Sequence, residues 1–131
     1  MRSTLIARLL LAAVAIAVAV SLVGLERDQE GCQDAVERAY LASQAPAAEL
    51  RGHVDEVVRE CRGAEPLNRI AVGLRIERPG VAARLARIAS RREPDSYVAW
   101  GVLAVAAAPA EAAAARRRAG ELNPLSVGAS P

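Results

Sequence analysis

The chain has 131 residues and a formal net charge of +2, and 53% of its residues are hydrophobic although it contains no phenylalanine. About 106 residues follow the first 25, which is enough for one small domain but not for two. The sequence shows no nucleophile–base pair, glycine-rich phosphate loop or metal-ligand cluster, so we expect neither an enzyme nor a bound cofactor.

Acidic and basic residues are unevenly distributed along the chain. Residues 26–65 contain ten acids and five arginines, a balance of −5, whereas residues 66–131 contain ten arginines and five acids, a balance of +5. This asymmetry could steer an acidic partner to the basic half, or favour head-to-tail contacts between copies of the chain. A chance distribution of solvated charges is the alternative.

The first expected element is an apolar helix near the N-terminus. Residues 9–25 carry no charge, and residues 5–25 have the length of a short membrane span if Arg8 extends its guanidinium to the lipid headgroups. Arg2 and Arg8 precede the apolar run and acids dominate just after it, so the positive-inside rule places the N-terminus in the cytoplasm. We expect a single-pass cell-membrane protein in which residues 1–25 form a cytoplasmic tip and signal anchor and the rest is extracytoplasmic.

Two other fates of this segment stay open. Residues 17–19 and 19–21 have the small-x-small pattern of a signal-peptidase site, and cleavage there would release a secreted helical protein. A lipidation site at Cys32 is disfavoured, because polar and acidic residues separate it from the apolar run. On every alternative the domain is exported, so nucleic acid is not expected as a partner.

After the anchor, apolar residues recur at spacings of three and four, the period of one helix face. Proline and other turn residues interrupt this pattern, and we expect Asn68 to cap one helix and Asp95 or Ser96 to cap another. The expected helices cover residues 28–43, 47–62, 69–78, 81–92, 97–107 and 109–122. The sequence therefore predicts an all-α fold of about three antiparallel hairpins, followed by a flexible tail at residues 125–131.

The two cysteines fall on the two helices of the first hairpin. Cys32 lies 13 residues before Ala45 in the turn and Cys61 lies 16 residues after it, which places them roughly 20 and 24 Å from the turn on facing helices. In an oxidising compartment this level placement favours a Cys32–Cys61 disulfide, which closes an acidic hairpin over residues 26–65. A structural zinc site is disfavoured because it needs four ligands and His53 is the only other soft candidate.

The remaining hairpins, residues 66–124, repeat a sequence pattern that is also present in the first hairpin. Four positions near the end of each hairpin recur with equal spacing, the second set shifted by 28 residues and the third by a further 30. The three sets are Val54, Val58, Cys61 and Pro66; Ala82, Ala86, Ala89 and Pro94; and Ala112, Arg116, Ala119 and Pro124.

With Trp100 and Leu103 in the preceding helix, this pattern resembles the tetratricopeptide repeat, which has W and L in its first helix and small residues and a closing proline in its second. The residues that carry the resemblance are Ala82, Ala89, Pro94, Trp100, Leu103, Ala112, Ala119 and Pro124. The chain departs from the family at Ala107, where a tyrosine is usual, and at Arg116, where a phenylalanine is usual. Its repeats of 28–30 residues are also shorter than the usual length of about 34.

The resemblance implies a right-handed array of hairpins whose curved face binds a peptide or helix from another protein. It therefore implies a membrane-tethered adaptor or scaffold with an envelope protein or peptide as partner. Self-association into a homo-oligomer, through the small residues of the anchor or through the array, is the alternative. Six arginines of the basic half are interpreted first as a solvated face, since every basic residue of the chain is an arginine, and a basic patch that binds an acidic partner is the alternative. They are Arg84, Arg87, Arg91, Arg116, Arg117 and Arg118.

Overall fold

The structure is a computed structural model that describes the backbone of residues 2–124 and, within that range, the side chains of residues 10–22, 24 and 29–124. Over this part of the chain the regular secondary structure is entirely helical, so the predicted all-α class is confirmed. The elements are α1 (Arg2–Leu41), η1 (Ala42–Gln44), α2 (Ala47–Glu60), α3 (Glu65–Leu74), α4 (Pro79–Arg92), α5 (Tyr97–Ala106) and α6 (Pro109–Leu122). The predicted tail at residues 125–131 lies outside the described residues.

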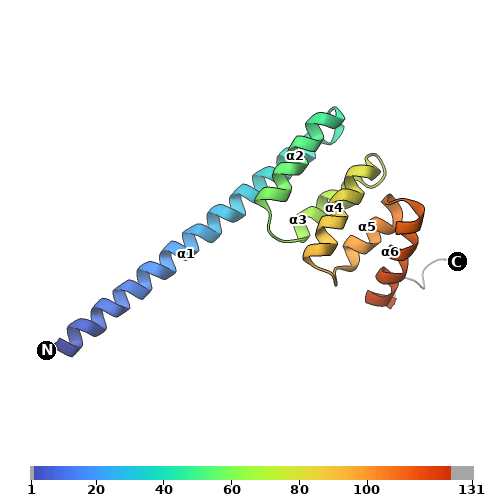
Figure 1. The fold of residues 1–131 in the computed structure, drawn as a ribbon. Coiled ribbons are helices and arrows are strands. Elements are labelled where there is room, and N and C mark those ends of the chain that lie inside the picture. Colours follow the sequence, from blue (N-terminus) through green and yellow to red (C-terminus); the bar gives the residue numbers. More distant parts are fainter. Residues whose placement is uncertain (1, 125–131) are drawn as a thin grey trace.

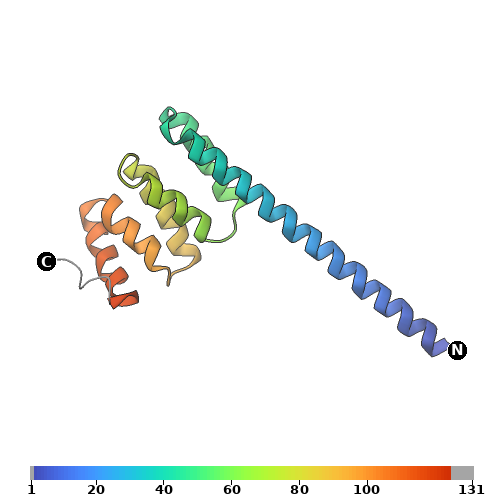
Figure 2. The same cartoon turned by 180° about the vertical axis from the view of Figure 1, so that it is seen from behind.

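The helices form three successive antiparallel hairpins, α1–α2, α3–α4 and α5–α6 (Figure 1). The first helices of the hairpins, α1, α3 and α5, contact one another in chain order, and α4 packs extensively against α5. Figure 1 faces the second helices of the hairpins, and Figure 2 faces α1, α3 and α5 from the opposite side. The array therefore has two distinct faces, one made by the first helices and the other by the second helices.

Helix α1 is longer than expected, because the apolar run and the helix predicted from residue 28 form one uninterrupted helix of 40 residues. Its N-terminal half projects away from the hairpins (Figure 1), and its described apolar side chains there, such as Leu11 and Val20, are exposed. Among the residues whose side chains are described, no helix is both long enough and apolar enough to cross a membrane. The predicted segment, residues 5–25, lies partly outside that set, since the side chains of residues 5–9, 23 and 25 are not described.

The core is built from small aliphatic residues, as the composition requires. Alanines are buried at helix crossings throughout the array, and the largest fully buried aliphatic side chains are Leu50, Leu67, Ile70, Leu85 and Leu103. Alanine lets helix axes approach closely, so a few leucines fill the remaining volume without any aromatic side chain at the centre.

Helix α3 starts earlier than the sequence predicts, whereas α5 starts at the predicted residue, Tyr97. Helix α3 begins at Glu65, with Pro66 in its first turn, so Asn68 lies inside the helix and the prediction that it is an N-cap is wrong. Ser96 does occupy the N-cap position of α5, but its side chain makes no capping bond. Its Oγ instead accepts a hydrogen bond from Nδ2 of Asn68 at 3.0 Å, so these two residues join α3 to α5 rather than cap either helix.

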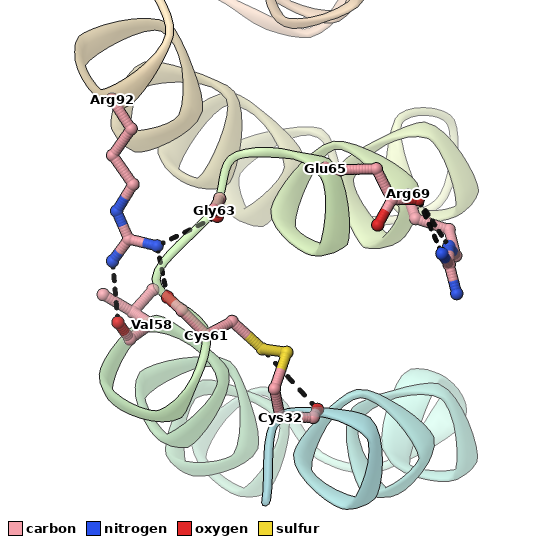
Figure 3. Close-up of a disulfide and its surroundings, with 7 residues drawn as sticks. All are labelled: Cys32, Val58, Cys61, Gly63, Glu65, Arg69 and Arg92. Carbon is pink, nitrogen blue, oxygen red and sulfur yellow. Dashed lines mark hydrogen bonds and ion pairs between the residues drawn. A yellow bond between two sulfur atoms is a disulfide. The ribbon is translucent and has the colours of Figure 1, made fainter. Parts of the chain in front are cut away.

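Arginines of the second hairpin tie it to the first at both ends, and a disulfide closes the first hairpin on itself. At the turn end, Arg78 donates to the carbonyl of Ala45 at 3.0 Å. At the other end, the Cys32 and Cys61 sulfurs lie 2.10 Å apart as a disulfide between α1 and the end of α2 (Figure 3). The guanidinium of Arg92, from α4, donates to carbonyls at the same end of α2, those of Val58, Cys61 and Gly63.

Candidate binding groove

Large apolar side chains are exposed on the face made by the first helices. Tyr40 of α1, Val72 of α3 and Tyr97 and Val105 of α5 have exposed fractions of 39, 37, 50 and 67%. Each of these helices already buries another face against its hairpin partner, so these residues remain uncovered where consecutive first helices meet. This accumulation on one face is typical of an interaction surface.

Three cavities lie along this face, and shared lining residues show that they adjoin one another. The proximal cavity, of about 500 Å³, lies between α1 and α3 and is lined by residues that include Val36, Tyr40 and Glu65. The middle cavity, of about 570 Å³, shares Tyr40 and Glu65 with it. The distal cavity, of about 300 Å³ between α3 and α5, shares Val72 and Val98 with the middle one. We call this row of adjoining cavities the groove.

Tyr40 separates the proximal and middle cavities and is held in place by α3. Its hydroxyl donates to the carbonyl of Arg69 at 3.0 Å. A Cβ atom at Gly73 would lie 3.4 Å from the edge of the tyrosine ring, so the ring packs closely against this part of α3. The tyrosine therefore forms a fixed apolar ridge between the two cavities.

The part of the groove made by the proximal and middle cavities is acidic. The proximal and middle cavities are lined by three glutamates, Glu37, Glu65 and Glu93, and by one arginine, Arg69. Arg69 is bound by Glu65 of its own helix at 2.6 Å (Figure 3), so that carboxylate already neutralises it. Glu93 is fixed at the edge of the middle cavity by the backbone N–H of Ala64, which donates to its Oε1 at 3.0 Å.

The predicted basic patch lies elsewhere, on the second helices α4 and α6. Three of its arginines form ion pairs within the array: Arg84 with Asp55 of α2 at 2.6 Å, Arg87 with Glu111 of α6 at 2.6 Å, and Arg118 with Asp95 and Glu121 at 3.1 Å each. The hydrogen bonds from Arg87 hold the pKa of the Glu111 carboxyl below its usual range. The other three, Arg91, Arg116 and Arg117, are exposed and form no ion pair within the described part of the chain.

The predicted repeat residues have structural positions that suit their sizes. Ala82, Ala89, Leu103 and Ala112 are buried, and Ala119 is half-buried. Pro94 follows α4 and Pro124 follows α6, and the Trp100 indole N–H donates to the carbonyl of Pro94 at 2.8 Å. These residues hold the helices together and do not line the groove, apart from Ala119 in the distal cavity.

The groove residues were missed in the sequence because each one fits the helical period of its own segment. One signal was present: residues 97–107 contain no charge, although a helix with only one buried face usually has a polar side. In the structure this extra apolar face of α5 is the wall of the distal cavity.

No protein-family model, curated protein or solved structure matches this chain.

Proposed function

We propose that this protein is a membrane-tethered, extracytoplasmic adaptor of tetratricopeptide-like architecture, whose groove binds a segment of another envelope protein. The observation that carries the proposal is the groove, with its exposed Tyr40, Val72, Tyr97 and Val105. Apolar side chains with adjoining cavities gain free energy when a protein segment covers them. Among the described residues, the exposed large hydrophobic side chains lie outside the second helices α2, α4 and α6.

The continuity of α1 supports a membrane-associated partner. If residues 5–25 are inserted in the bilayer, the rigid helix carries the groove only a short distance above the surface. The proximal cavity is lined by α1 residues from Gln29 to Leu41, which lie about 6–24 Å beyond Leu25 at the rise of an α-helix. A partner segment must therefore come within this distance, which favours a membrane protein over a freely diffusing one.

Self-association is the second candidate, and one observation favours it. The described apolar side chains of the projecting half of α1 are exposed, and its alternating alanines allow close helix packing in lipid. On this alternative the anchor, rather than the groove, makes the principal contact, so removing residues 1–25 would abolish assembly while changes in the groove would not.

A photocrosslinking experiment in native membranes separates these functions. The photoreactive residue p-benzoylphenylalanine is placed at Val105 in the groove and, as a matched control on the same hairpin, at the exposed Ala114 on α6. The adaptor predicts one dominant envelope protein crosslinked from Val105 and absent from Ala114. Crosslinks to the protein itself alone would favour self-association, and equal labelling from both positions would refute binding in the groove.

The tether has its own test. Full-length protein should stay in the membrane pellet after alkaline carbonate extraction, and a variant lacking residues 1–25 should not. Recovery of the full-length protein in the supernatant would refute the tether without bearing on the groove.

A further inference from the structure

The floor of the middle cavity contains a buried polar group that the fold does not satisfy. Asn68 lines this cavity and is only 7% exposed. Its Nδ2 donates to Ser96, but its Oδ1 is buried without a hydrogen-bond partner in the described part of the chain. An unsatisfied buried carbonyl oxygen is costly, and a positive group placed near it offsets part of that cost.

The rim of the same cavity adds negative charge. Glu93 is fixed there by the backbone N–H of Ala64, and Glu65, the next residue in the chain, also lines the cavity with Arg69 bound to it. In the adjoining proximal cavity Glu37 is exposed and forms no ion pair within the described residues. In the proximal and middle cavities, two carboxylates, Glu37 and Glu93, therefore remain beyond the one that neutralises Arg69. The distal cavity, away from these carboxylates, has Arg75 among its lining residues.

The walls between these charges are apolar. Tyr40 and Val72 line the middle cavity, and Val98 continues it toward α5. A long side chain with an aliphatic stem and a charged end fits this combination, because the stem covers apolar surface while the end reaches the carboxylates. Lysine and arginine are the residues with that construction.

We propose, building on the proposed function, that the groove recognises a protein segment in which lysine or arginine accompanies apolar residues, and that the middle cavity receives the cationic side chain. Glu93 and Glu37 attract the charge, the Asn68 carbonyl dipole favours it from below, and the apolar walls hold the stem and its neighbours. An acidic segment is repelled by the same carboxylates.

Selection from a displayed library of random dodecapeptides tests this inference. The bait is full-length protein in nanodiscs of phosphatidylcholine, which carries no net charge. Peptides that also bind empty nanodiscs, or the Gly101→Leu variant, are removed. A Cβ at Gly101 meets no atom within 4 Å and this residue lines the distal cavity, so we expect a leucine side chain there to fill part of the groove. The peptides that remain bind through the groove.

We expect these peptides to contain lysine and arginine at more than about twice their frequency in the library. Their affinity should fall about tenfold for the variant Glu37→Gln/Glu93→Gln, and the affinity of the wild type should weaken as salt screens the charges. The matched control Glu49→Gln/Glu121→Gln removes two exposed carboxylates that do not line the groove, and it should keep wild-type affinity.

The failures of the two proposals are distinguishable. Groove-specific peptides without basic enrichment, with acidic enrichment, or with unchanged affinity for Glu37→Gln/Glu93→Gln would overturn the cationic recognition and leave the binding groove intact. The absence of any groove-specific peptide would overturn both proposals. A dimer in mass photometry that Gly101→Leu converts to a monomer would show that a second copy occupies the groove, and would overturn the cationic-segment proposal.

Discussion

Removing the disulfide should destabilise one end of the array far more than the other. The bond joins residues 29 positions apart, and in the chain-entropy model a loop of that size contributes about 3.6 kcal/mol. Residual structure in the unfolded chain reduces this value, so we expect a loss of about 3 kcal/mol. The loss should fall mainly on α2, because the bond is what closes the open end of the first hairpin against α1.

The matching assay is amide hydrogen exchange, read by mass spectrometry, on full-length Cys32→Ser/Cys61→Ser protein in nanodiscs. A loss of about 3 kcal/mol corresponds to exchange from α2 that is faster by roughly two orders of magnitude. Exchange from α6, which lies two hairpins away, should change by less than about tenfold. A dithiol reductant should reproduce the α2 result in the wild type and have no effect on the double variant.

Two results would refute this reasoning. Unchanged exchange from α2 would mean that the carbonyl contacts of Arg92 and the packing of Val54 and Val57 hold the hairpin closed without the bond. Equal acceleration in α2 and α6 would mean that the array unfolds as a single unit, so that a local effect of the disulfide does not exist.

Three further predictions concern stability. Arg92→Met should cost about 2–3 kcal/mol, measured by urea unfolding, because three carbonyls at the end of α2 lose a charged donor; a cost below about 0.5 kcal/mol would show that water replaces it. Ionised Glu111 is favoured in the folded state, since Arg87 lowers its pKa from 4.5. Its contribution is therefore present above pH 4.5 and lost as the pH falls below that value. Because solvent screens this partly exposed pair, Glu111→Gln should flatten the acid loss of stability by no more than about 0.5 kcal/mol, and an unchanged pH profile would contradict this. Gly101→Ala should stabilise α5 by about 1 kcal/mol, as Gly52→Ala should stabilise α2, because both positions have open space for a Cβ; destabilisation at either would contradict the helical glycine assignment.

The helices were predictable from sequence because each buries one face at the helical period and proline residues punctuate the chain. Their starts were less predictable. Proline is favoured in the first turn of a helix as well as after the end of one, so Pro66 and Pro79 lie within the first turn of α3 and α4 rather than before them. The sequence analysis also divided α1 into an apolar run that ends at residue 25 and a separate helix from residue 28. Residues 26–30 contain neither proline nor glycine, so the helix continues through them.

The groove could not be predicted, because it depends on which exposed faces meet between hairpins. Val72 and Val105 are 33 residues apart, yet both line the distal cavity. The basic patch was predicted from local spacing alone, which places its arginines on the same helix faces. In the structure three of these arginines form ion pairs with acids from other segments. Whether a charge is available to a partner is thus decided by tertiary contacts that local spacing does not encode.

These pairings also change what the charge asymmetry of the sequence means. Arg84 of the basic half binds Asp55 of the acidic half, so part of the separation along the chain is cancelled by folding. The separation of charge that remains is between the two faces of the array. Glu37 and Glu93 border the groove, whereas Arg91, Arg116 and Arg117 are exposed on the second helices.

Such an arrangement gives the two faces opposite preferences for a charged segment. A cationic segment is attracted by the groove and repelled by the arginines of the second helices, so it is directed to the face that carries the groove. An anionic polymer or headgroup would instead meet the arginines of the second helices and be kept out of the groove. Reversing Arg116 and Arg117 to glutamate should therefore leave the equilibrium affinity of a groove-bound cationic peptide nearly unchanged while adding weak, salt-sensitive binding on the outer face. Loss of groove binding in that variant would place the cationic segment on the second helices instead.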